Sequence, residues 1–147
     1  MGQLSIPASA VVYADTSIFI YTIEVNPNYY GLLQPLWALV QAKQVEIITS
    51  ELTLMEVLVV PLRDANADLV STYEQFLQSS DIQLVPIDQA VLRSAARLRA
   101  TTNLKTPDAI HAATALSEGC TIFLTNDSQF RTVPELFTIV LREILAA

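Results

Sequence analysis

The sequence has few of the residues that cross-link or loosen a small protein. Its 147 residues include one cysteine, one histidine and three glycines. Because Cys120 has no second cysteine to pair with, an internal disulfide is excluded and a reducing compartment is indicated. One cysteine and one histidine, His111, cannot supply the four ligands of a usual structural zinc site. With no low-complexity tract and so little glycine, the chain shows no linker, and we expect a single domain over residues 1–147.

Long apolar runs and targeting signals are also missing. No basic segment precedes an apolar run near residue 1, as a secretory signal would require. The most apolar stretches are interrupted by Glu56, Arg142 and Glu143, well short of the ~20 residues of a membrane-spanning helix. We therefore expect a cytoplasmic protein that does not enter a membrane. Hydrophobic residues make up 52% of the chain, which excludes disorder and indicates a buried oligomer or partner interface.

Basic residues are scarce and unevenly placed. Eight bases face fifteen acids, for a net charge of −7, so the chain is not a generic nucleic-acid binder. No acid occurs from residue 89 to residue 107. The bases of that stretch are Arg93, Arg97, Arg99 and Lys105. They form either a strip that follows an RNA backbone or a solvated helix face, and both interpretations remain open.

The apolar pattern predicts strands that alternate with helices. Because the strand segments are apolar on both faces, they indicate an α/β fold with a parallel sheet covered on both sides. We expect Pro61 to stop the third helix, Thr106 to cap the last one and Gly119 to end it. The predicted strands are Val11–Asp15, Val45–Thr49, Ile82–Ile87, Thr121–Thr125 and Phe137–Leu141. The predicted helices are Ser17–Ile23, Tyr30–Lys43, Leu52–Val60, Ala65–Gln78, Ala90–Ala100 and the segment from Thr106 to Glu118.

Four acids stand out, and such a sheet places its functional cleft at the carboxyl ends of the strands. Asp15 ends the first strand, Asp127 follows the Thr121–Thr125 strand, and Glu56 lies on the helix that follows the second strand. Asp108 lies in the first turn of the last predicted helix. Each acid also has a purely structural interpretation. Asp15 can cap a helix, Glu56 fits a capping box, Asp108 suits a helix dipole, and Asp127 suits a turn.

The surroundings of these acids favour a functional role. Glu56 lies in an otherwise apolar segment, and Asp108 begins a helix that is mostly apolar. Buried carboxylates need hydrogen-bond partners or a cation, and converging carboxylates raise one another's pKa. Oxygen ligands without histidine or cysteine favour Mg²⁺ or Mn²⁺. His111 lies one helical turn after Asp108, where it either approaches the cleft or packs locally.

The order of these motifs resembles that of the PIN-domain ribonucleases, and within them the VapC-like toxins of bacterial toxin–antitoxin pairs. The motifs are Asp15-Thr16-Ser17 after a strand, Glu56 in a helix, Thr106-Pro107-Asp108, and Thr125-Asn126-Asp127 followed by Phe130. The resemblance spans residues 11 to 141. It implies a three-layer α/β/α sandwich with a central, mostly parallel sheet. It also implies a homodimer that a small antitoxin protein inhibits by occupying the cleft.

By this resemblance, the chain is a metal-dependent endoribonuclease that hydrolyses RNA phosphodiester bonds with Mg²⁺ or Mn²⁺. The residues that match the catalytic, metal-binding acids are Asp15, Glu56, Asp108 and Asp127. The residues expected to orient water around them are Thr16, Ser17, Thr125 and Asn126. The residues expected to contact RNA are Arg93, Arg97, Arg99, Lys105 and Arg131.

Two other functions compete with this one. A catalytically silent PIN-like domain would only bind RNA or a protein, but the presence of all four acids argues against a loss of activity. A phosphoaspartate phosphatase would need a second aspartate two residues after Asp15, where this chain has Ser17.

Overall fold

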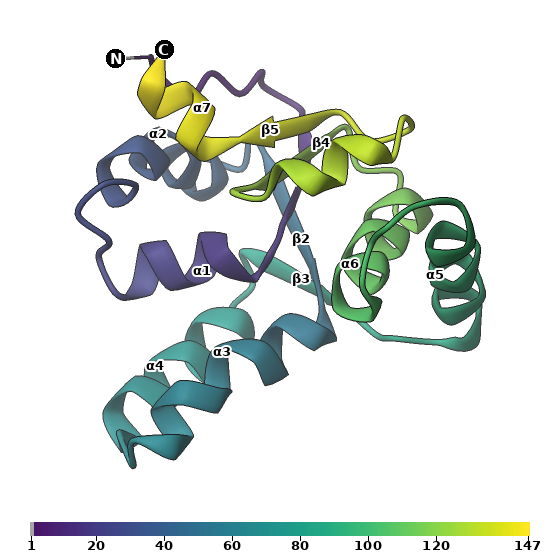
Figure 1. The fold of residues 1–147 in the computed structure, drawn as a ribbon. Coiled ribbons are helices and arrows are strands. Elements are labelled where there is room, and N and C mark those ends of the chain that lie inside the picture. Colours follow the sequence, from purple (N-terminus) through teal and green to yellow (C-terminus); the bar gives the residue numbers. More distant parts are fainter. Residues whose placement is uncertain (1) are drawn as a thin grey trace.

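A computed structural model describes residues 2–147, which form a five-stranded parallel sheet in the order β3-β2-β1-β4-β5 (Figure 1). The strands are β1 (Val11–Ala14), β2 (Glu46–Ser50), β3 (Ile82–Val85), β4 (Ile122–Thr125) and β5 (Thr138–Val140). The helices are α1 (Thr16–Ile23), α2 (Tyr30–Gln41), α3 (Glu51–Arg63), α4 (Ala67–Leu77), α5 (Gln89–Thr101), α6 (Thr106–Ser117), the 3₁₀ helix η1 (Ser128–Thr132) and α7 (Leu141–Ala146). The predicted α/β fold with a parallel sheet is confirmed.

Helices cover both faces of the sheet. Successive side chains of a strand point to opposite sides, so each strand contributes to two cores. In β1, Val12 and Ala14 belong to a core shared with α1, α2 and α4, whereas Tyr13 belongs to a second core shared with α5 and α6. Figure 1 shows α5 and α6 together on one side, and α1 and α2 on the other. The α/β/α layers predicted from the resemblance are therefore present.

Local features account for several element ends. β3 is an edge strand that ends at Val85, two residues before the predicted end, because Pro86 cannot donate to a sheet ladder. The Asp88 side chain accepts a hydrogen bond from the Val91 amide at 2.9 Å and so caps α5. Gly119 follows α6 with φ +66°, the left-handed conformation typical of a residue just past a helix end.

Most predicted element ends differ from the observed ones by one to three residues, and two of these differences concern residues expected to set a boundary. α3 continues through Pro61 to Arg63 instead of stopping before the proline. Pro61 removes one hydrogen bond of the helix, but only two residues of α3 follow it, and the Asp64 amide still bonds to the Val60 carbonyl at 2.9 Å. The N-cap of α6 is Lys105, so Thr106 is the first helical residue and not the cap.

The sequence pattern also missed two short elements, η1 and α7. Both are too short for an apolar periodicity to repeat. Among residues 2–147, no helix is long and apolar enough to cross a membrane.

Candidate active site

Asp15 lies at the carboxyl end of β1, which is the central strand. Only 8% of the residue is exposed. Its Oδ1 accepts a hydrogen bond from the Ser17 hydroxyl at 2.6 Å, and its Oδ2 accepts one from the Thr125 hydroxyl at the end of β4. Although Asp15 occupies the N-cap position of α1, its side chain makes no capping hydrogen bond. The carboxylate therefore bonds to the hydroxyls of Ser17 and Thr125 and does not cap the helix.

Burial is the main influence on the protonation of Asp15. It raises the pKa of the carboxyl group, and the hydrogen bonds from Ser17 and Thr125 together with the nearby His111 offset only part of that rise. A carboxylate that is costly to ionise in this position would gain from a cation beside it.

Glu56 reaches the same edge of the sheet from the second turn of α3. Its Oε1 accepts a hydrogen bond from the Thr16 hydroxyl at 2.6 Å and lies 2.7 Å from Nε2 of His111. The capping-box interpretation of Glu56 is wrong, because the N-cap of α3 is Ser50, whose own hydroxyl accepts from the Leu52 amide at 3.0 Å. Burial works to raise the pKa of Glu56, but the bonds from His111 and Thr16 outweigh it and hold the pKa below its usual value.

The structure places His111 beside Glu56. Of the two interpretations that the sequence leaves open, the ring therefore approaches the acids and does not merely pack locally. The ring is buried in α6, with 3% of the residue exposed. Its Nδ1 lies 2.6 Å from the hydroxyl of Tyr13, which is fully buried in β1. The sequence offers no sign of this role for Tyr13, because a tyrosine in an apolar strand is ordinary core composition.

Asp108 and Asp127 complete the group of acids. Asp108 is half-buried in the first turn of α6. Burial and then Asp127 raise its pKa, with smaller contributions from Asp15 and Glu56, while His111 opposes the rise. The four acids therefore share one electrostatic environment. Asp127 is also engaged locally, because its Oδ1 accepts from the Gln129 amide at 2.9 Å and caps η1.

The carboxylate oxygens of the four acids are the kind of ligand that a hard divalent cation prefers. The acids do not, however, surround a common point. Among residues 2–147, no three His, Cys, Asp or Glu side chains converge closely enough to hold a metal ion between them. A carboxylate can accept about four hydrogen bonds, and Asp15 and Glu56 each accept only two. Burial raises the pKa of Asp15, and burial together with the neighbouring carboxylates raises the pKa of Asp108. A bound cation would offset both effects by stabilising the charged form of each acid.

The hydroxyl and amide residues around the acids divide into two groups. Thr16, Ser17 and Thr125 each donate a hydrogen bond to one of the acids. Asn126 instead donates to the Tyr21 hydroxyl at 3.0 Å and accepts from the Arg142 amide at 2.8 Å. Its side chain thus connects the start of α7 to α1.

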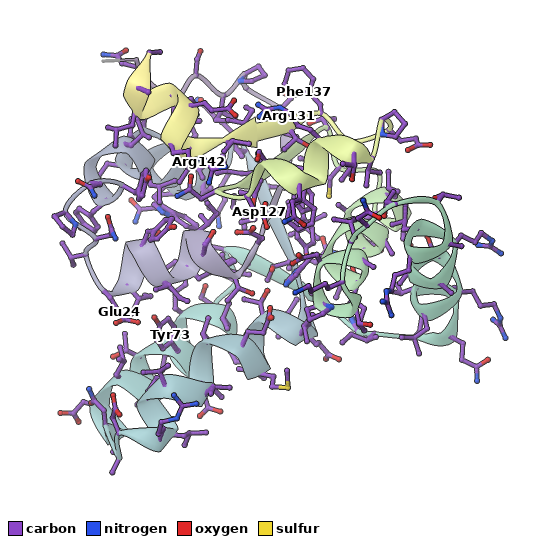
Figure 2. All side chains as sticks on the ribbon, in the orientation of Figure 1. Glu24, Tyr73, Asp127, Arg131, Phe137 and Arg142 are labelled. Atoms are coloured by element: carbon purple, nitrogen blue, oxygen red, sulfur yellow. The ribbon has the colours of Figure 1, made fainter. Side chains whose placement is uncertain are left out.

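Arg142 is a basic residue near the acids that the sequence analysis did not single out. Its guanidinium donates to the Asn126 carbonyl at 2.9 Å and to the Ser128 hydroxyl at 3.1 Å. These two residues flank Asp127, and Figure 2 shows Arg142 on the same side of the molecule as Asp127. No local pattern marks Arg142, because it lies in a separate segment that the chain brings back after β5.

The predicted basic strip lies on α5 and at the start of α6. Arg93 and Arg97 are exposed one turn apart. Arg99 donates to the Leu104 carbonyl at 3.3 Å, and Lys105 directly precedes α6. Arg131 lies apart from them in η1 and pairs with Glu143 at 2.6 Å.

The family comparison agrees with this geometry. A PIN-domain family model matches residues 12–136, a range that contains all four acids. No curated protein sequence matches the chain.

Solved toxin–antitoxin structures share the fold. VapBC2 from Rickettsia felis, bound to a DNA fragment from its promoter, has a TM-score of 0.70 at 20% identity, over 88% of this chain and 98% of that one. VapC20 from Mycobacterium tuberculosis, a sarcin-ricin loop cleaving toxin, has a TM-score of 0.71 at 16% identity, over 86% and 97%. A toxin–antitoxin complex from Klebsiella pneumoniae has a TM-score of 0.65 at 24% identity, over 88% and 96%.

Proposed function

The chain belongs to the PIN-domain family, and on that basis we propose that it is a metal-dependent endoribonuclease, the toxin of a toxin–antitoxin pair. The observation that carries the proposal is the shared environment of Asp15, Glu56, Asp108 and Asp127 at the carboxyl edge of the sheet. Structural roles alone would not require three other acids to raise the pKa of Asp108 at a single edge of the sheet.

We assign the binding of Mg²⁺ or Mn²⁺ to these four acids, because carboxylate oxygens are the ligands that both ions prefer. When bound, such an ion activates a water molecule and neutralises the charge that develops on the transferred phosphoryl group. The hydroxyls of Ser17 and Thr125 hold the two oxygens of Asp15 in place. Thr16 and His111 do the same for one oxygen of Glu56.

RNA is the substrate that this proposal assigns. A phosphodiester backbone is repelled by a protein of net charge −7, so its approach depends on local positive charge. Arg142 supplies such charge beside Asp127, and Lys105 supplies it at the start of α6, the helix that carries Asp108. The description of VapC20 as a toxin that cleaves the sarcin-ricin loop supports RNA as the substrate class.

A small antitoxin and a second copy of the chain are the proposed partners. The toxin–antitoxin structures that share this fold support the first. An apolar stripe on α3 supports assembly in general, because Met55, Val59 and Leu62 lie on one helix face and are 58%, 44% and 62% exposed. An apolar stripe of this kind marks a surface that a partner covers.

The test is cleavage of a structured RNA by the purified protein with Mg²⁺, with Mn²⁺ and with excess EDTA. We expect cleavage only with metal, and none from the Asp15→Asn variant in any condition. Cleavage that persists in EDTA contradicts the metal mechanism. RNA binding without cleavage, in every metal, identifies the chain instead as a silent binding domain.

A further inference from the structure

A continuous chain of hydrogen bonds leads from the backbone of β2 to Glu56. The Ser50 amide lies 3.1 Å from the Tyr13 hydroxyl, the hydroxyl lies 2.6 Å from Nδ1 of His111, and Nε2 of His111 lies 2.7 Å from Oε1 of Glu56. The first three residues of this chain are all buried. It connects three elements, β2, β1 and α6, to an acid on a fourth, α3.

The geometry favours one direction for each bond. A backbone amide only donates, so the Tyr13 oxygen accepts from Ser50. A phenol is protonated at neutral pH, so the Tyr13 hydroxyl has one hydrogen to donate, and Nδ1 of His111 lies 2.6 Å from it. When the hydroxyl donates to Nδ1, a neutral ring carries its own hydrogen on Nε2, which faces Oε1 of Glu56.

The other end of the chain leaves one oxygen of Glu56 uncommitted. Oε1 accepts from both Thr16 and His111. Among residues 2–147, no hydrogen bond to Oε2 is present. A glutamate side chain is long and mobile, so binding a ligand costs conformational entropy. Fixing Oε1 in advance reduces the entropy that is lost when Oε2 binds a ligand. Hydrogen bonds from outside a metal site orient ligating carboxylates in this way.

We propose that Tyr13 and His111 are positioning residues: Tyr13 fixes the Nε2–H tautomer of His111, and His111 holds Oε1 of Glu56 so that Oε2 is presented to the active-site ligand. This inference rests on the proposed function for the identity of that ligand, a divalent cation. The hydrogen-bond arrangement itself does not depend on it.

The first test reads the tautomer directly. His111 is the only histidine of the chain, so a single pair of ring nitrogen signals appears in an ¹⁵N spectrum of the full-length protein. In the neutral ring, which the nitrogen shifts of the same spectrum identify, we expect the hydrogen on Nε2 and none on Nδ1. A ring with its hydrogen on Nδ1 overturns the inference.

The second test separates the two nitrogens of His111 by substitution. The amide nitrogen of glutamine lies close to the place of Nε2, whereas asparagine offers an oxygen close to the place of Nδ1. Mn²⁺ affinity is measured by electron paramagnetic resonance of the free ion, without RNA. We expect His111→Asn to weaken Mn²⁺ binding by about 10- to 100-fold, as loss of a bond outside the metal site commonly does, and His111→Gln to restore most of it. Equal losses in the two variants overturn the inference, because a merely structural role would not distinguish them.

Tyr13 has a matched control in Tyr73. Both tyrosines are fully buried, but the Tyr73 hydroxyl donates to Glu24, and Figure 2 shows this pair well apart from Asp127. We expect Tyr13→Phe to weaken Mn²⁺ binding and Tyr73→Phe to leave it unchanged. A protein that shows these contrasts but cleaves no RNA overturns only the proposed function. A protein that cleaves RNA without these contrasts overturns only the inference.

Discussion

Thr125 donates its hydroxyl hydrogen to Asp15, although 110 positions separate the two residues in the chain. The bond follows from the register of the sheet. Ala14 pairs with Leu124, so the next residue of each strand stands at the same edge, and the Asp15 amide bonds to the Leu124 carbonyl at 3.2 Å. The orientation of the central acid therefore depends on strand pairing as well as on Ser17, its neighbour in sequence.

Replacing Thr125 with valine tests this relationship. The change keeps the shape of the side chain and removes the only hydrogen that it donates to Asp15. We expect RNA cleavage and Mn²⁺ affinity to fall by about 10- to 100-fold, because the acid loses a partner that orients it. The circular dichroism spectrum should stay that of the wild type. Full activity in Thr125→Val means that Ser17 alone orients the acid.

Thr138 gives a matched control on the neighbouring strand β5. Its hydroxyl oxygen is buried and has no hydrogen-bond partner among residues 2–147. We expect Thr138→Val to leave cleavage unchanged and to raise the free energy of unfolding by about 1 kcal/mol, because an unsatisfied buried hydroxyl is removed. Chemical denaturation measures the difference, and a destabilised variant contradicts this account of Thr138.

Asp15→Asn should abolish cleavage and stabilise the metal-free protein at neutral pH. Burial raises the pKa of Asp15 in the folded state, so its contribution to stability is fully present below its unfolded pKa and is lost as the pH rises through the folded value. Asparagine carries no charge, so the stability of the variant does not fall in this way as the pH rises. Thermal melts in EDTA from acidic to neutral pH should show the gap between variant and wild type widening as the pH rises. A variant that unfolds at neutral pH shows that the acid is structural.

Metal binding should raise the thermal midpoint of the wild type. A ligand that binds only the folded state stabilises it by about 2.7 kcal/mol at 100 times its dissociation constant. We expect Mg²⁺ and Mn²⁺ to raise the midpoint of the wild type, and Asp15→Asn and Asp108→Asn to lose most of that gain. A gain that survives in both variants places the metal elsewhere in the protein.

The exposed pair Arg93 and Arg97 on α5 tests whether the basic strip follows RNA. Replacing both with glutamate should weaken RNA binding across sequences and reduce its salt dependence by about one unit of log–log slope for each lost phosphate contact. Arg63→Glu at the far end of α3 serves as the control, and Mn²⁺ affinity should stay unchanged in all variants. An unchanged slope in the double variant means that the strip is only a solvated helix face. Arg131 or Arg142 would then be the expected RNA contact.

The sequence predicts the parallel sheet, and with it the edge at which Asp15 and Asp127 lie, because strands have local patterns. Short apolar runs indicate strands, and the carboxyl ends of parallel strands define one edge. Glu56 shows the limit of such patterns. Its capping-box spacing from Thr53 is a frequent local motif, but the residues that bind it, Thr16 and His111, come from α1 and α6.

The parts that the sequence does not predict depend on register and on distant segments. Tyr13 and His111 lie 98 positions apart, and their contact requires α6 to pack on the face of β1 that Tyr13 occupies. Arg142 reaches the loop beside Asp127 only because β5 pairs with β4 and α7 begins at the same edge. Neither relationship has a signature in the residues next to it.

The position of β1 at the centre of the sheet has a consequence during protein synthesis. Asp15 is made early, but its neighbour strand β4 and the acid that follows it are made only after residue 121. Most of the chain must therefore be synthesised before Asp127 can lie beside Asp15. Any nascent or prematurely terminated product that lacks β4 carries an incomplete set of acids, so the edge of the sheet becomes a site only when synthesis is nearly finished.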